Sequence, residues 1–188
     1  MAAFLLLCLL FLVQDRTDAA DGSPYCSYKA QPGTCCQRFR LIVNRDSHVC
    51  LKASSSYNSK HGPNRAALFE TDNYGQPSGG IGGWAAKTNN ANQWIQVGFD
   101  SSRRVTGVLL QGRGGPTTGD QWVTSFRVLF SDDEKVFYST PVIEGTFDRD
   151  TVAHRYFDHP ITARYFRINP VTWHGHITLR FDLLGCDV

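Results

Sequence analysis

The sequence predicts an all-β protein, either a sandwich or a barrel. Two observations support this. Segments in which apolar residues recur at every second position are separated by clusters of Gly, Asp, Asn and Pro. No stretch shows the 3.6-residue apolar stripe of an amphipathic helix, so we expect no helix longer than a turn or two.

The strand pattern is clearest at residues 94–99. Trp94 and Gln96 would lie on one face of this strand, with Ile95, Val97 and Phe99 on the other, because side chains alternate along a strand. The other segments expected to contain strands are residues 40–43, 105–110, 125–130, 155–157, 165–168 and 176–183. Together they provide enough alternating strands for one sandwich-sized domain.

The first nineteen residues resemble a signal peptide. Residues 3–13 form an unbroken apolar run, which as a helix would span about 16 Å, roughly half of a bilayer core. The Thr17-Asp18-Ala19 sequence that follows fits the small-x-small pattern of a cleavage site. A buried core helix is the alternative, but no amphipathic pattern continues the run. We therefore expect a secreted, extracellular protein with a signal peptide at residues 1–19.

The charge of the chain argues against several partners. The formal net charge is +2, and no basic block is longer than Arg103-Arg104. Neither nucleic acid nor strong attraction to an anionic membrane is expected from such a balance. Residues 20–35 are rich in turn-forming residues and are expected to form a short leader that contains cysteine.

Five cysteines remain once the signal peptide is removed. They are Cys26, Cys35, Cys36, Cys50 and Cys186. In an exported chain these thiols should be oxidised, and an odd number leaves one that is free or pairs with a second chain. Zinc is not expected, because no Cys-x-x-Cys pair faces a second pair at ligand spacing. No cofactor is implied.

A series of short sequences, in a fixed order, resembles one known family. These are residues 53–58 (Ala-Ser-Ser-Ser-Tyr-Asn), 63–66, 83–86, 93–97, 105–108, 111–113, 120–123 (Asp-Gln-Trp-Val), 126–128, 163–170, 173–177 and 184–186. Any one of them alone is weak evidence, but their order is specific. The chain is identified as similar to the discoidin domains, also called coagulation factor V/VIII type C domains, over residues 36–186.

The resemblance implies a jelly-roll-like antiparallel β-sandwich of about eight main strands. In this fold the two chain ends meet at one pole and are tied by a disulfide. The resemblance implies Cys36 with Cys186 as that pair, with Cys35 as the alternative to Cys36. A bridge closing a loop of about 150 residues contributes roughly 4–5 kcal/mol in the chain-entropy model.

The first strand departs from the family pattern. Residues 39–43 replace the family's usual sequence after its first cysteine, and the pattern does not explain Cys26, Cys35 or Cys50. These three are candidates for an extra or intermolecular disulfide. A disulfide-linked homo-oligomer, which would gain avidity, is therefore one hypothesis.

The resemblance places the ligand at the loops opposite the joined ends. Lipid-binding members of the family carry exposed apolar residues at the loop tips, and here the tips at 58–64 and 113–120 carry none. Amide, hydroxyl and charged groups suit a glycan or a cell-surface or matrix protein, in adhesion or recognition. Anionic phospholipid such as phosphatidylserine is the alternative ligand. The candidate ligand-binding residues are Tyr57, Asn58, Lys60, His61, Arg113, Thr117, Asp120 and Trp173.

Catalysis and metal binding are not expected. The chain has no Gly-x-Ser-x-Gly turn and no cysteine in an activating motif. On a strand, His174 and His176 would share a face and offer two metal ligands, but no third can be named. We interpret them as packing or loop-stabilising residues.

The remaining tryptophans and asparagines have a structural interpretation. Trp84, Trp94 and Trp122 are expected to pack in the core or support the loops. Asn89-Asn90 and Asn92 are expected to satisfy turns.

Overall fold

The computed structural model describes residues 39–40, 49–73, 75, 79–116 and 119–187. The elements of this part are β1 (Phe39–Arg40), β2 (Val49–Ala53), the 3-10 helices η2 (Ser59–His61) and η3 (Pro63–Arg65), β3 (Trp84–Ala85), β4 (Ile95–Gln111), β5 (Trp122–Ser131), β6 (Tyr138–Ser139), β7 (Ile143–Glu144), β8 (Ala153–His174) and β9 (Thr178–Asp187). No helix in these ranges is long and apolar enough to cross a bilayer.

Several predictions made from the sequence fall outside these ranges. The signal peptide, the leader, Cys26, Cys35, Cys36 and Thr117 all lie there. The side chain of Cys186 is also outside the description, so the Cys36–Cys186 disulfide stays a prediction. Cys50 is described: it is a free, exposed thiol on β2.

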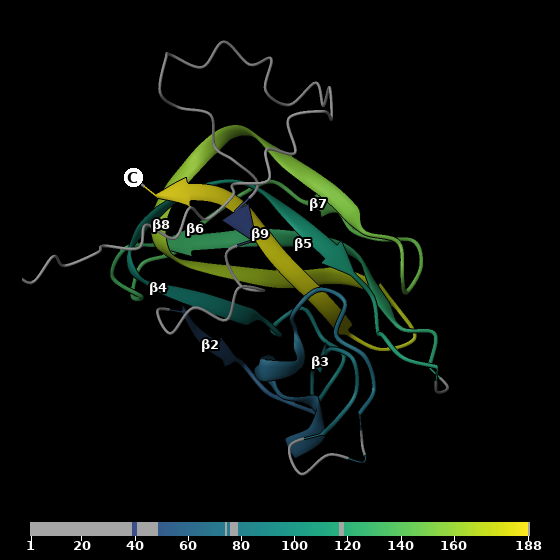
Figure 1. The fold of residues 1–188 in the computed structure, drawn as a ribbon. Coiled ribbons are helices and arrows are strands. Elements are labelled where there is room, and N and C mark those ends of the chain that lie inside the picture. The colour runs from purple at the N-terminus through teal and green to yellow at the C-terminus, as the bar shows by residue number, and fades with distance from the viewer. Residues whose placement is uncertain (1–38, 41–48, 74, 76–78, 117–118, 188) are drawn as a thin grey trace, which may run out of the picture. The chain divides into compact units, whose positions relative to one another are not determined.

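The strands form an antiparallel sandwich, which confirms the predicted fold class (Figure 1). The hydrogen-bonded order is β1-β9-β4-β8-β5-β6, with β2 paired to β4, β3 to β9 and β7 to β5. β1 pairs with the end of β9, Phe39 opposite Gly185, so the beginning and end of this part lie side by side. This agrees with the joined ends that the resemblance implied.

β4 and β8 are longer than the sequence pattern indicated. Residues 94–99 and 105–110 were expected to be separate strands, but they belong to the single strand β4, just as β8 contains both 155–157 and 165–168. The pairing of β4 with β8 shifts register between Gly98 and Arg103. Strands that bend at such irregularities pass from one layer of a sandwich to the other.

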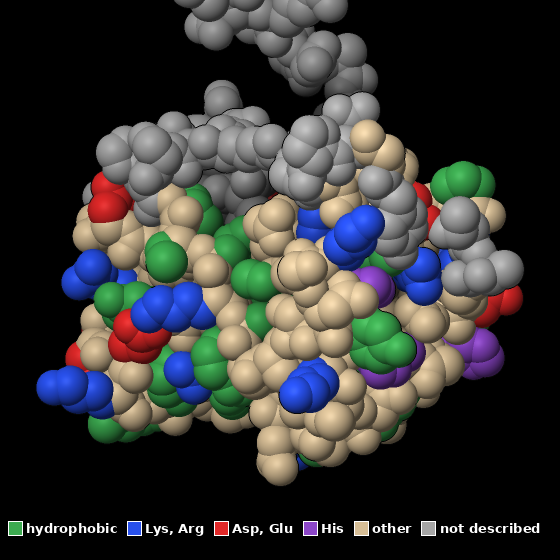
Figure 2. Space-filling model, turned by 90° about the horizontal axis from the view of Figure 1, so that it is seen from below, with side chains coloured by type: hydrophobic (Ala, Val, Ile, Leu, Met, Phe, Trp, Pro, Cys, Tyr) green, Lys and Arg blue, Asp and Glu red, His purple; other side chains and the backbone are tan. Residues whose placement is uncertain are grey.

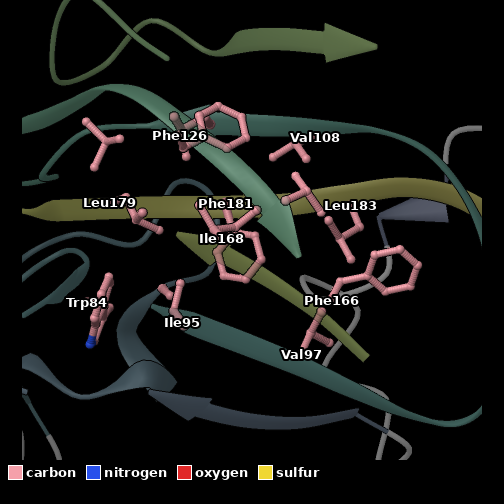
Figure 3. Packing of buried hydrophobic residues seen from close by; sticks show 14 of the residues in the cluster. Trp84, Ile95, Val97, Val108, Phe126, Phe166, Ile168, Leu179, Phe181 and Leu183 are labelled. Atoms are coloured by element: carbon pink, nitrogen blue, oxygen red, sulfur yellow. The ribbon is translucent and has the colours of Figure 1, made fainter. Parts of the chain in front are cut away.

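The paired strands β4 and β8 have different neighbouring strands on either side of the bend. The first part of β4 pairs with β2 and the later part of β8 with β5. Beyond the bend, β4 pairs with β9. The core fills the space between these layers, and Figure 3 shows Phe126, Phe166 and Phe181 among its side chains. Ile95, Val97 and Phe99 are buried as the alternation predicted.

Candidate ligand-binding site at the loop pole

Several connecting segments gather at the end of the sandwich away from the β1–β9 pairing (Figure 1). We call this end the loop pole and define it by residues 54–65, 69–73, 79–93, 112–116, 119–121, 145–152 and 175–177. Backbone bonds join these segments: the Ile81 N–H donates to Lys60 O at 3.1 Å, and the Gly114 N–H donates to Gly82 O at 2.6 Å. The two predicted tips are thereby held beside each other.

Glycines allow this close approach. A Cβ on Gly82 would lie 2.5 Å from Glu70 O, and one on Gly114 would lie 2.2 Å from the same oxygen. Real Cβ atoms do not come so close to a backbone oxygen, so a side chain at either position would push the segments apart. The Gly-Gly-Ile-Gly-Gly run at 79–83 therefore lets the segments of the pole approach one another closely.

Two buried arginines hold the carbonyls of the pole. Arg65 donates from Nε to Ile81 O at 2.8 Å and from Nη2 to Thr71 O at 2.7 Å, while its Nη1 pairs with Glu70 at 2.6 Å. Arg180, on β9, is 3% exposed and bonds further loop carbonyls in the same way. Since loop carbonyls away from strands need donors, these side chains make the pole rigid. Sequence reasoning gave neither residue a role.

Tyr57 is an exposed aromatic residue in the first segment of the pole. Its N–H donates to Ala85 O at 2.9 Å, which fixes its backbone against β3, and the residue is 59% exposed. The ring packs against His61 (centroids 5.1 Å apart) and against the edge of His176 (5.8 Å). The His176 Nε2 donates to Ala86 O at 2.7 Å, so that ring is fixed too.

Asn58 orients the imidazole of His61. The Asn58 Oδ1 caps η2 by accepting the Lys60 N–H at 2.9 Å, and it lies 2.6 Å from His61 Nδ1. Because this oxygen only accepts, Nδ1 must carry the hydrogen. The neutral His61 ring therefore keeps its Nε2 as an acceptor. Lys60 itself is exposed on the same short helix.

Arg113 lies close enough to influence His61. Burial lowers the pKa of His61, and the charges of Arg113 and His176 lower it further, while Asp72 opposes them. The Arg113 Nη1 is 3.4 Å from Gln121 Oε1, and its buried Nε has no hydrogen-bond partner among the described residues.

The other predicted residues have different surroundings. Asp120 has a side chain that is 76% exposed and lies 3.7 Å from Arg149. Trp173, near the end of β8, is partly buried and packs against the core. The structure thus groups Tyr57, Asn58, Lys60, His61 and Arg113, and places Asp120 near a second group of side chains.

The two histidines of the Trp-His-Gly-His sequence do not share a face. β8 ends at His174, and Gly175 follows with φ of +65°. His174 stacks on Trp122, whereas His176 turns toward Tyr57. The strand geometry assumed for a shared metal site is therefore absent. In the part of the chain that the structure describes, no group of three His, Cys, Asp or Glu side chains could hold a metal ion.

The structure also explains the tryptophans and asparagines. Trp84 is buried in the core, whereas Trp94 stacks on Arg167 outside it. Asn89 accepts the Ile177 N–H at 2.9 Å, and Asn90 accepts the Asn92 N–H at 3.0 Å. These asparagines satisfy turns, as predicted.

Two exposed phenylalanines at the pole were missed by sequence reasoning. Phe147 is 71% exposed and Phe69 is 51% exposed. Phe69 has φ of +64°, and its N–H donates to Gln111 Oε1 at 3.0 Å. Neither belongs to the two tips that were compared with lipid-binding relatives.

Figure 2 shows the molecule from the side of β2, β3 and the 3-10 helices. Most of this face is backbone and uncharged polar side chains, and the Lys and Arg side chains are scattered. Histidines gather on one side of it, beside hydrophobic side chains. Such a mixture is typical of a surface that binds polar ligands with an apolar face.

The family model described as F5/8 type C domain matches residues 51–183. The chain belongs to this family. It is 36% identical over 146 residues to a discoidin-1 polypeptide of Dictyostelium discoideum, covering 76% of this chain and 56% of that protein. It is 38% identical over 125 residues to lactadherin of Mus musculus, covering 63% of this chain and 26% of lactadherin.

A solved member of the family has the same architecture. Discoidin II of Dictyostelium discoideum has 30% sequence identity and a TM-score of 0.67, over 74% of this chain and 56% of that one. The chain thus spans about half the length of the discoidins that it matches. Discoidin-type domains are binding modules rather than catalysts.

Proposed function

We propose that this F5/8 type C protein is a secreted, non-catalytic recognition module that binds glycans through the loop pole, in adhesion or surface recognition. The observation that carries the proposal is the exposed Tyr57 ring, which contacts the rings of His61 and His176, with Arg113 close enough to lower the pKa of His61.

The arrangement matches the two kinds of surface that a sugar presents. A pyranose has an apolar face that stacks on an aromatic ring, and Tyr57 offers a ring that is fixed and 59% exposed. Its hydroxyls need both acceptors and donors. The His61 Nε2 accepts, and the guanidinium of Arg113 and the ammonium of Lys60 donate. Few, well-placed polar groups around an apolar surface are typical of small-ligand sites.

Two carboxylates near the Tyr57 group, Glu70 and Asp72, are engaged in holding the loops. Glu70 pairs with Arg65 at 2.6 Å, and Asp72 accepts the Gly82 N–H at 2.8 Å. Both therefore have structural roles. Glycoside hydrolysis requires two carboxyl groups that face a substrate, and Glu70 and Asp72 are already engaged in holding loops.

A glycan array followed by calorimetry tests this function. We expect Tyr57→Ala to weaken glycan affinity about 10-fold or more, because stacking and burial of the ring are lost. Tyr57→Phe should retain most of the affinity. Tyr138→Ala is the matched control, since Tyr138 is 65% exposed on β6. An array without hits, or equal affinity in Tyr57→Ala, would overturn the proposal.

A second candidate function is peripheral binding of anionic phospholipid. It is favoured by Phe147 and Phe69, because each fully buried aromatic side chain contributes roughly 1.5–3 kcal/mol. Sedimentation with phosphatidylserine vesicles, compared with phosphatidylcholine vesicles, tests it. Loss of selective binding in Phe147→Ser would support this function; no preference for phosphatidylserine would exclude it.

A further inference from the structure

The turn at Gly175 divides the loop pole into two aromatic surfaces. On one side the rings of His176, Tyr57 and His61 are in contact. On the other side His174 stacks on Trp122. The turn requires glycine, because Gly175 has φ of +65° and a Cβ there would lie 2.5 Å from Asp120 O.

The Trp122–His174 pair is a stack of two rings at the end of the sheet, and the face of His174 that Trp122 leaves uncovered is the platform it offers. The two residues face each other across β5 and β8, with ring centroids 4.1 Å apart and planes 12° from parallel. His174 is exposed, and its ring makes no hydrogen bond to the residues that the structure describes. Neither residue belongs to the core cluster of the sandwich.

Polar groups border this platform. A Cβ on Gly112 would lie 2.7 Å from Trp122 Cβ and 2.9 Å from Arg149 Cα, so Trp122 and Arg149 are neighbours. The Asp120 carboxylate is 3.7 Å from Arg149 and mostly exposed. A carboxylate accepts from hydroxyls and a guanidinium donates to them. An aromatic platform with this pair beside it has the chemistry of a saccharide site.

We propose that Trp122, His174, Asp120 and Arg149 form a second saccharide subsite. The ligand would then be an oligosaccharide lying over the Gly175 turn, with one sugar on Tyr57 and a following sugar on the Trp122–His174 platform. This inference rests on the proposed glycan-binding function and deepens it from single sugars to chains.

The spacing along the backbone fits a continuous chain of sugars. His174 and His176 are two residues apart, so their Cα atoms are separated by at most roughly 7 Å. Each histidine contacts the aromatic ring of its own surface. The backbone positions that carry the two surfaces are therefore next to each other, and the Gly175 turn directs the two rings to different aromatic neighbours.

Calorimetry with sugars of increasing length tests the subsite. The probes are one, two and three β-1,4-linked units of galactose and, separately, of N-acetylglucosamine, with the full secreted chain. We expect affinity to rise about 3- to 10-fold from one unit to three in the series that binds. His174→Ala should abolish this gain and leave the affinity for the single sugar unchanged. Tyr57→Ala should weaken every member of the series.

Further variants separate a ligand contact from a folding defect. Asp120→Asn leaves the stacked rings in place and should reduce the gain with chain length. His159 is an exposed histidine on β8 away from the platform. His159→Ala should therefore leave the affinity for one, two and three units unchanged. Equal affinity for one and three units, or an equal loss for both in His174→Ala, would overturn the subsite while leaving the Tyr57 site intact. No binding at any length would overturn both proposals.

Discussion

The protonation of His61 links the chemistry of the pole to pH. The ring donates from Nδ1 to Asn58 and faces the cationic side of the pole. Burial is the largest cause that lowers its pKa, followed by Arg113 and His176. At neutral pH the ring is therefore neutral, and its Nε2 is available as an acceptor for a hydroxyl.

We expect His61 to titrate below the usual histidine value of about 6.5. In the unfolded chain the ring takes its proton near that value, whereas in the folded protein it does so only at lower pH. Its contribution to stability is therefore present above about pH 6.5 and is lost as pH falls through the folded pKa. Nuclear magnetic resonance of the imidazole nitrogens measures the midpoint directly.

Arg113→Gln provides the internal comparison for this prediction. Removing the positive charge that lowers the His61 pKa should move the midpoint upward. Arg127→Gln, at an exposed position on β5, should leave it unchanged. A midpoint for His61 at or above 6.5 in the unaltered protein would contradict the prediction.

Residue by residue, five of the candidate ligand-binding residues come together in the structure, and their binding role stays a prediction. Tyr57, Asn58, Lys60, His61 and Arg113 lie in two loops whose sequences resemble the family, and backbone bonds bring those loops together. The role of His176 depends on the positive φ of Gly175. Periodicity along a strand could not reveal that this turn sends the two histidines to different sides.

At the scale of elements, a layer of stacked side chains covers the outer face of one sheet. The guanidinium of Arg167 lies 4.1 Å from the ring centre of Trp94 and 3.7 Å from that of Phe137. Its Nε donates to Gln96 at 2.7 Å, and Gln96 donates in turn to Glu134 at 2.8 Å. This layer links β4, β8 and the turn after β5.

Arg167→Lys should lower the free energy of unfolding by about 1–2 kcal/mol. A lysine retains the charge but loses the planar stacking against two rings and the fixed Nε–H bond. Denaturant unfolding measures the loss. Glycan affinity should stay unchanged, because the layer does not belong to the Tyr57 site; a parallel loss of affinity would instead mean that the layer supports the pole.

The strands show where alternation succeeds and where it fails. It predicted the inward face of residues 94–99, yet Gln96, on the other face, is also buried, because the Arg167 layer covers it. Alternation also predicted two separate strands where the structure has the single strand β4, and two more where it has β8. The bend residues 100–104 are polar and resemble a turn in sequence, but they keep sheet pairing through Arg103 with Ala163.

At the scale of the whole molecule, the loop pole and the sandwich form one packed unit. The Phe181 N–H on β9 donates to Ala66 O at 2.7 Å, and Trp84 pairs with Leu179. Arg180 extends from β9 and reaches three loops: Nε donates to Gly112 O at 2.7 Å, Nη1 to Glu70 O at 3.0 Å and Nη2 to Arg149 O at 2.7 Å.

Arg180→Met should therefore destabilise the whole protein and not only one loop. Methionine fills similar space but leaves three carbonyls without their donor, and losing such a buried network costs roughly 3–5 kcal/mol. Tryptophan fluorescence and far-ultraviolet circular dichroism should still report a single coincident transition, shifted to lower denaturant. Arg127→Met, at an exposed position, is the control and should shift it little. Suppose instead that the fluorescence transition moved to lower denaturant while the circular dichroism transition stayed in place. The loop pole would then unfold independently of the sandwich, which would contradict the prediction.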